Sequence, residues 1–281
     1  MEIGEYSEIL RHEHAGRGHY LGEPANDSIT VSQVQSFSLV IPAYNEEKRI
    51  APFLEELNVK IPRNWEIIII CDGNDGTAEV AKSIGERFRV FEYGRKLGKG
   101  GAILEGFKKA NGDIIGYVDA DGALDAREIV KVFTRVSEKT PVAIASRWVK
   151  GSNILKKQPL IRVILGRLYH YSTFFVLGIK QKDTQCGLKA YKAEVIREIV
   201  GKLTLTNLSI DTAILYHCKL LGYSVSEVPA TWNDIGGSKF HPVKSAIVMF
   251  VTLIGLRLAH ATKSKKLKNK LAEVHEIVKG I

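Results

Sequence analysis

Short apolar runs and helical segments alternate along the first half of the chain. The apolar runs are rich in β-branched residues, as expected for strands buried on both faces of a sheet, and they lie at Phe37–Ile41, Trp65–Ile70, Phe88–Phe91, Ile114–Val118 and Val142–Ser146. Helices are expected between them, at about Asn45–Leu57, Ala78–Glu86, Gly98–Ala110 and Ala126–Ser137. Asn45 is the predicted N-cap of the first helix. This order predicts an α/β fold with a mostly parallel central sheet and helices on both faces.

The second half of the chain is less regular. Leu160–Ile179 is apolar and aromatic but contains Arg162, Arg167 and His170, and charges at this spacing argue against a membrane span. The pattern favours an amphipathic helix lying in a membrane interface, at about 159–179; a core helix with a basic edge is the alternative. The other expected elements are a loop at Lys182–Ala190, a helix at Leu208–Leu221, a strand at Tyr223–Trp232 and an uncharged run at Ser245–Leu256 that is too short to cross a bilayer.

Length and composition fit one sizeable domain. The chain has 281 residues, of which 45% are hydrophobic, enough to fill a core. We predict a main domain at 37–240, an N-terminal arm at 1–36, and C-terminal amphipathic helices that end in a basic tail at 241–281. Residues 1–21 lack the apolar segment of a secretory signal. The cysteines are far apart, which favours buried thiols in a reducing compartment; they are Cys71, Cys186 and Cys218.

Charge is divided unevenly between the two halves. Residues 1–140 hold 18 basic and 23 acidic residues, a net charge of −5, whereas 141–281 hold 22 basic and 8 acidic residues, a net charge of +14. Five of the lysines lie between Lys263 and Lys270. This asymmetry suggests an anionic partner for the second half, either anionic lipid or nucleic acid, with a solvated basic surface as the alternative.

Two acids follow the fourth predicted strand. Asp119 and Asp121 are separated by one small residue and followed by Gly122, which allows a turn. In an extended segment, residues i and i+2 point the same way, so both carboxylates are expected to leave the strand end together. Paired carboxylates suit a hard divalent cation that shares its shell with water and a substrate phosphate. A surface turn with two solvated acids is the alternative.

Other motifs agree with an anion-binding site. Glycines and lysines open the helix that begins near Gly98, and such a helix start binds anions readily, although the spacing is not that of a Walker A loop. Four segments in order resemble the inverting glycosyltransferases of family 2, which have the GT-A nucleotide-sugar-binding fold: Ile41–Glu47, the Asp72 loop, Gly98–Ala102 and Asp119–Ala123. Within that family the chain is similar to the enzymes that load a sugar onto dolichyl or another polyprenyl phosphate.

Later segments narrow the resemblance to the dolichyl-phosphate glucose synthases. Lys182–Lys189 and Trp232–Lys239 are similar to segments of those enzymes. The related mannose synthases usually carry a metal-binding Gln where this chain has Ala123, and an Arg where it has Asn233. Both departures favour the glucose branch. The loop that starts at Cys71 is one residue shorter than is usual in either branch, which bears on recognition of the base.

The resemblance implies roles for individual residues. Those expected around the nucleotide sugar are Pro42, Ala43, Tyr44, Glu46, Asp72, Lys99, Asp119, Ala120, Asp121 and Lys239. Arg147 matches the family's acceptor-phosphate arginine, and a planar guanidinium suits a phosphate; Arg162 is a second candidate. Asp183 lies where relatives carry an acid near the reacting centre. It either orients the sugar, acts as a base or stabilises a turn.

The implied reaction is transfer of a sugar from a nucleotide sugar, with UDP-glucose the leading candidate, to dolichyl or polyprenyl phosphate with inversion. The expected cofactor is Mg²⁺ or Mn²⁺, and the expected location is the cytoplasmic face of a membrane, without a spanning helix. Alternatives are a GDP-mannose-dependent synthase, a transferase with a non-lipid acceptor, and a basic nucleic-acid-binding protein. The basic, amphipathic second half speaks against a non-lipid acceptor. No helix-turn-helix, RNP or zinc pattern supports nucleic-acid binding.

Overall fold

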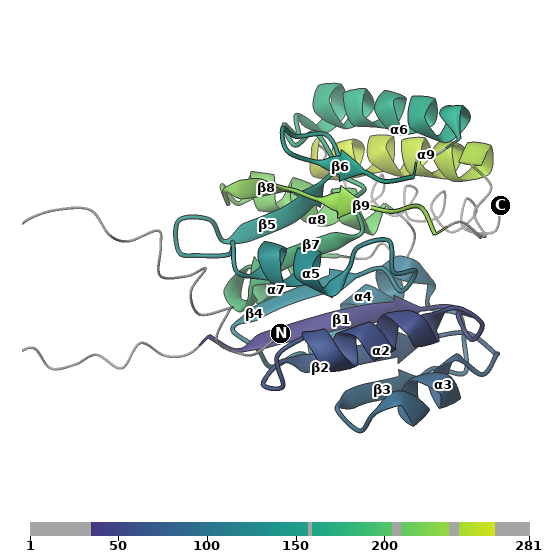
Figure 1. The fold of residues 1–281 in the computed structure, drawn as a ribbon. Coiled ribbons are helices and arrows are strands. Elements are labelled where there is room, and N and C mark those ends of the chain that lie inside the picture. Colours follow the sequence, from purple (N-terminus) through teal and green to yellow (C-terminus); the bar gives the residue numbers. More distant parts are fainter. Residues whose placement is uncertain (1–34, 157–158, 204–208, 236–241, 262–281) are drawn as a thin grey trace, which may run out of the picture. The chain divides into compact units, whose positions relative to one another are not determined.

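A seven-stranded sheet forms the centre of the protein (Figure 1). The computed structural model describes residues 35–156, 159–203, 209–235 and 242–261. The sheet order is β3-β2-β1-β4-β7-β5-β8, with bounds β1 Phe37–Ala43, β2 Glu66–Cys71, β3 Phe88–Glu92, β4 Ile114–Val118, β5 Val142–Ser146, β7 Leu188–Lys192 and β8 Val225–Pro229. Only β7 runs antiparallel to its neighbours in this sheet. The predicted mostly parallel α/β sheet is confirmed.

Helices cover both faces of the sheet. One face carries α2 (Ile50–Lys60), α3 (Thr77–Ile84) and α5 (Ala126–Phe133), and the other carries α4 (Gly98–Lys109), α7 (Ala193–Val200) and α8 (Ile210–Leu220). Successive strand residues alternate between the two cores: Leu39 and Ile41 pack in the core under α2, and Val40 packs in the core under α4. Burial on both faces explains why these strands are continuously apolar.

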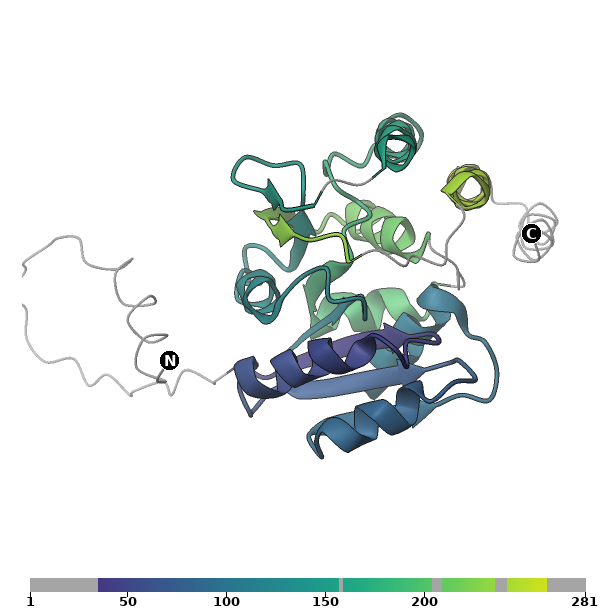
Figure 2. The same ribbon diagram turned by 45° about the vertical axis from the view of Figure 1, so that its right-hand side comes forward.

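Two further helices lie beyond the second face. α6 (Leu160–Ser172) continues into a π-helical turn, η1 (Thr173–Leu177), and α9 spans Pro242–Ala261. Figure 2 shows α6 and α9 nearly end-on, side by side, and Tyr169 of α6 packs edge-on against Phe250 of α9. A small separate sheet pairs β6 (Asn153–Ile154) with β9 (Thr231–Trp232). Within the described ranges, no helix is long and apolar enough to cross a membrane.

Three sequence predictions about these elements are wrong. Asn45 does not cap the first helix, which begins at Ile50; Asn45 has a left-handed backbone (φ 55°) and exchanges hydrogen bonds with Asn74. The predicted strand Tyr223–Trp232 is two strands, because Ala230 donates to Ser146 O between them and the chain then joins the second sheet. The predicted loop Lys182–Ala190 runs into β7.

The cysteines and the chain ends complete the comparison with the sequence. All three cysteines are free and buried, and burial raises the pKa of each thiol to about 12. Buried thiols were therefore predicted correctly. Most of the predicted arm at 1–36 and the basic tail from 262 onward lie outside the described residues.

Candidate active site

The predicted site residues gather at one edge of the sheet. The chain passes from β1 through β2 to β3 on one side, then returns to β4 on the other side of β1. Ligands of open α/β sheets bind outside the carboxyl ends of the strands at such a reversal. Tyr44 follows β1, Asp72 follows β2, Asp119 follows β4 and Arg147 follows β5. Because β7 is antiparallel, the loop that leads into it, with Asp183, reaches the same edge.

Asp119 is paired with Lys99 from the first turn of α4. Lys99 Nζ lies 2.9 Å from Asp119 Oδ1 and 3.1 Å from Oδ2. Burial raises the pKa of Asp119; Lys99 opposes this, and the nearby charges of Asp121 and Asp211 add to it. Burial opposes the charge of Lys99, but Asp119 and Asp211 raise its pKa above the ordinary value. An ammonium group thus already lies against the predicted metal ligand.

Asp121 lies in the turn that follows β4. Since β4 ends at Val118, the two acids are not on an extended strand, contrary to the argument from sequence. Asp121 Oδ1 accepts a hydrogen bond from Ala123 N at 3.0 Å, and Gly122 adopts a left-handed backbone (φ 71°) that completes the turn. Asp121 is nevertheless near enough to Asp119 for its charge to contribute to the raised pKa of Asp119 described above.

Asp72 and the loop after β1 form the other side of this edge. Asp72 is buried, and its Oδ2 accepts hydrogen bonds from Leu97 N at 2.8 Å and Gly98 N at 2.9 Å, which fixes the start of α4. Tyr44 is exposed, with Lys96 Nζ 4.5 Å from its ring centroid. Glu46 binds Arg49 through both carboxylate oxygens. Among the small residues predicted here, Ala43 and Ala120 are buried, so neither exposes a surface to a ligand in this structure.

Arg147 and Asp183 form a bidentate ion pair. Arg147 Nε donates to Asp183 Oδ2 at 2.7 Å, Nη2 donates to Oδ1 at 2.8 Å, and the Arg147 backbone N–H donates to Oδ2 at 2.9 Å. Burial raises the pKa of Asp183, but the Arg147 charge and hydrogen bonds outweigh it and hold that pKa below the ordinary value. A carboxylate so engaged is a poor proton acceptor, so the geometry favours an orienting role over that of a base.

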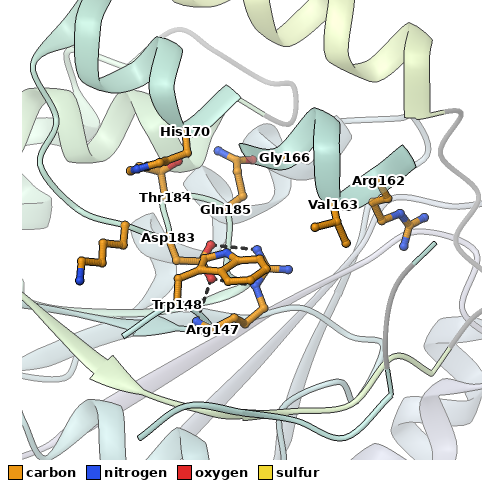
Figure 3. Close-up of a pocket in the computed structure, with 10 residues that line it drawn as sticks. Arg147, Trp148, Arg162, Val163, Gly166, His170, Asp183, Thr184 and Gln185 are labelled. Carbon is orange, nitrogen blue, oxygen red and sulfur yellow. Dashed lines mark hydrogen bonds and ion pairs between the residues drawn. The ribbon is translucent and has the colours of Figure 1, made fainter. Parts of the chain in front are cut away.

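The ion pair opens into a cavity beneath α6 (Figure 3). The cations Arg147, Arg162 and Lys182 line it, together with Trp148, Val163, Gly166, His170, Thr184 and Gln185. Arg162 lies apart from the Arg147–Asp183 pair, on the other side of the cavity. His170 is also part of the wall, and burial, with help from Arg167, lowers its pKa. Asp183 also lines the cavity and offsets the charge of Arg147, so Arg162 and Lys182 give the lining its net positive charge, which suits an anionic ligand. Lys239 lies outside the described residues.

Comparison with known proteins identifies the family. The family model described as "Glycosyl transferase family 2" matches residues 38–200. The chain belongs to glycosyl transferase family 2. This glycosyltransferase is 32% identical to dolichyl-phosphate beta-glucosyltransferase of Dictyostelium discoideum over 83% of its own length and 77% of that protein. It is 31% identical to the enzyme of the same name from Saccharomyces cerevisiae, over 79% and 74%.

Solved structures support the fold of this glycosyltransferase. Glucosyl-3-phosphoglycerate synthase from Mycobacterium tuberculosis, solved with Mn²⁺, UDP and glucosyl-3-phosphoglycerate, superposes with a TM-score of 0.60 at 17% identity, covering 80% of each chain. At this identity the likeness concerns the fold alone. The predicted GT-A fold and the predicted likeness to dolichyl-phosphate glucosyltransferases are both confirmed.

The acidic pair of this glycosyltransferase fits a divalent cation. Two carboxylates, Asp119 and Asp121, lie at the carboxyl end of β4, and an ion bound there would compete with Lys99 for the oxygens of Asp119. No group of three or more His, Cys, Asp or Glu side chains suited to a metal occurs among the described residues. Such a site suits an ion that takes its remaining oxygens from water and a diphosphate, as Mg²⁺ commonly does.

Two acids at the site carried no signal in the sequence. Asp211, at the start of α8, is 1% exposed; its Oδ1 pairs with Lys189 and accepts from Tyr117 OH, and its Oδ2 lies 3.2 Å from Lys99 Nζ. Burial opposes its charge, but Lys189 and Lys99 lower the pKa of Asp211 to about 2. Glu227 on β8 accepts from the backbone N–H groups of Lys182 and Asp183. Both acids reach the site only because segments distant in sequence pack together. A local sequence motif does not predict such packing.

Proposed function

We propose that this glycosyltransferase moves glucose from a nucleotide sugar, with UDP-glucose the leading candidate, to dolichyl or another polyprenyl phosphate with inversion. The observation that carries the proposal is the cavity beside Arg147, whose lining has a net positive charge and which is covered by a helix with an apolar, exposed outer side. An acceptor with a phosphate head and a long hydrocarbon tail matches that combination. The names of the relatives from D. discoideum and S. cerevisiae support it.

At the donor end, charge stabilisation is the main chemical task. The bond to the departing diphosphate breaks as negative charge accumulates on it, and preorganised cations lower the barrier most. Asp119 and Asp121 would hold Mg²⁺ or Mn²⁺, which would supply Lewis-acid stabilisation of the diphosphate. Lys99 adds a positive charge beside Asp119, and Asp72 fixes the helix start from which Lys99 projects.

At the acceptor end, positioning matters more than deprotonation. A phosphate monoester has a second pKa near 6, so it is mainly dianionic at neutral pH and already nucleophilic. Arg147 would contact the acceptor phosphate, held at the strand end by Asp183. Asp183 in turn is positioned by Glu227 through its backbone. Arg162, on the far wall, would contact the phosphate or a lipid headgroup.

α6 and η1 would lie on the membrane surface. Residues that line the cavity, such as Val163 and His170, lie on one side of α6. The opposite side and η1 expose large apolar side chains: Leu160, Ile161, Ile164, Leu168, Tyr171, Phe174 and Phe175. The helix is not the basic-edged core helix of the alternative interpretation, because Tyr169 is its one buried residue. An amphipathic helix of this kind lies in a bilayer interface, here on the cytoplasmic face.

Calorimetry with nucleoside diphosphates tests the donor assignment. In the presence of Mn²⁺, we expect UDP to bind more tightly than GDP or TDP. Tighter binding of GDP would contradict UDP-glucose and favour the mannose branch, despite Ala123 and Asn233. Absence of binding by all three would contradict the nucleotide-sugar site itself.

A further inference from the structure

Asp211 is a buried carboxylate whose two oxygens have different partners. Oδ1 pairs with Lys189, which is itself fully buried, and accepts a hydrogen bond from Tyr117 OH. Oδ2 lies 3.2 Å from Lys99 Nζ. The structure therefore holds Asp211 firmly in place next to Lys99.

Lys99 bridges two carboxylates with unequal access to ligands. The Asp119 side chain is 35% exposed, whereas that of Asp211 is 1% exposed. An incoming cation can reach Asp119 but not Asp211. Lys99 can therefore stay paired with Asp211 when a ligand binds, whereas its contact with Asp119 can be replaced by a bound cation.

We propose that Asp211 is a positioning residue that holds Lys99 in place as the internal counterion of Asp119. When a divalent cation binds Asp119, Lys99 releases that carboxylate and contacts the donor diphosphate. The inference rests on the proposed function, because it takes Asp119 as a metal ligand and a nucleoside diphosphate as part of the donor. Lys99 neutralises Asp119 in the free protein, and its bond to Asp211 means that its release leaves no buried ammonium unpaired. Lys99 therefore competes with the metal but assists the nucleotide.

Replacing Lys99 should change the affinity for the metal and the affinity for the nucleotide in opposite directions. In Lys99→Met, the ammonium that competes for the Asp119 oxygens is gone, so Mn²⁺ should bind the nucleotide-free protein about tenfold more tightly. UDP at saturating Mn²⁺ should bind about tenfold more weakly, because one cation facing the diphosphate is lost. Asp211 keeps Lys189 and Tyr117 as partners in this variant, so the fold should persist.

The experiment is calorimetry of Mn²⁺ alone and of UDP at saturating Mn²⁺, with circular dichroism on each protein. Lys108→Met, on the exposed far end of the same helix, removes an equal charge and should change neither affinity. Asp211→Asn should weaken binding of Mn²⁺ alone, because Lys99 then has only Asp119 as a partner, and adding Lys99→Met should abolish that loss. The Lys99→Met result decides the role of Lys99 even where Asp211→Asn fails to fold.

The outcomes distinguish this inference from the proposed function. Opposite changes of the two affinities in Lys99→Met support it. If the wild type binds Mn²⁺ and UDP but Lys99→Met shifts both affinities in one direction, or shifts neither, the inference is overturned and the proposed function stands. A wild type that binds neither Mn²⁺ nor UDP overturns both.

Discussion

Gly187 lies directly against the Asp119 carboxylate. A Cβ built on Gly187 would be 2.1 Å from Asp119 Oδ2 and 2.5 Å from Cγ, closer than real Cβ contacts come. The Gly187 carbonyl also accepts a hydrogen bond from Asp119 N at 2.9 Å. The loop before β7 therefore packs on the predicted metal ligand, and a side chain at position 187 must displace it.

We predict that Gly187→Ala removes most activity without unfolding the protein. A displacement of about 1 Å at a reacting centre costs roughly 10²-fold in rate, and Asp119 is partly exposed, so it has room to move. Transfer rates and Mn²⁺ affinity should both fall. Gly201→Ala is the control, since a Cβ there meets nothing within 4 Å. Near-normal rates in Gly187→Ala would show that the position of Asp119 is not critical.

Asp119→Asn and Asp121→Asn should each lower turnover by about 10²-fold or more while the fold is retained. Both substitutions keep the size of the side chain and remove a negative charge that the proposed metal needs. Asp113→Asn, at the opposite end of the same strand, is the control, because the Asp113 carboxylate there accepts hydrogen bonds from Ser36, away from the site. Either site variant with a wild-type rate in Mg²⁺ or Mn²⁺ would refute the metal assignment.

The Arg147–Asp183 pair predicts a pH dependence of stability. The pKa of Asp183 is lower in the folded protein than its unfolded value of about 3.9. The unfolded chain therefore binds more protons in acid, and the stabilisation by Asp183 is present above about pH 4 and lost as pH falls through the folded pKa. Asp183→Asn should cost about 3 kcal/mol at pH 7 and flatten the acid dependence. Urea unfolding at several pH values measures both.

The same lowered pKa makes a prediction about catalysis. Asp183 is ionised throughout the neutral range, so its titration should not appear in the pH–rate profile above about pH 5. Asp183→Asn should raise KM for polyprenyl phosphate by misplacing Arg147, with UDP affinity unchanged. The contrary result would be a wild-type rate that falls in acid with a pKa near neutrality, together with loss of that pH dependence in Asp183→Asn. It would show that Asp183 acts as a base.

Membrane attachment should depend on η1. Phe174 and Phe175 are 45% and 78% exposed, so replacing both with Ser should leave circular dichroism unchanged. Flotation with anionic liposomes should fall, above all in high salt, where basic residues contribute little. Val59→Ser, which changes an exposed apolar side chain on α2, should float as the wild type does. If the double variant of Phe174 and Phe175 floats as well as the wild type does, η1 has no interfacial role.

The sequence predicted the strands that carry continuous apolar runs and the loops that follow them. A short, continuous apolar run is the pattern expected of a strand that is buried on both faces. Ligands bind at the carboxyl ends of such strands, so the loops that follow them were predicted as the site. β7 was missed because Leu188–Lys192 contains two lysines. Lys189 is fully buried, and its ammonium is paired with Asp211, 22 residues away, and with the carbonyl of Cys186.

The coupling of site residues was also hidden. Arg147 and Asp183 were predicted as separate residues, whereas they form one bidentate unit across 36 positions. Asn45 was expected to cap a helix from its residue type, but its amide instead joins Asn74 across two loops. The structural propensity of a residue type reflects its interactions with sequence neighbours. It could not predict these contacts, because they join residues that are distant in sequence.

Transfer of labelled sugar to polyprenyl phosphate tests the central claim most directly. The purified chain is incubated with UDP-glucose, GDP-mannose or TDP-glucose, with dolichyl phosphate or a soluble sugar as acceptor, and with Mg²⁺, Mn²⁺ or a chelator. We predict lipid-linked glucose in the β configuration from UDP-glucose and dolichyl phosphate, abolished by the chelator. Glucose transferred to the soluble sugar but not to dolichyl phosphate would contradict the account.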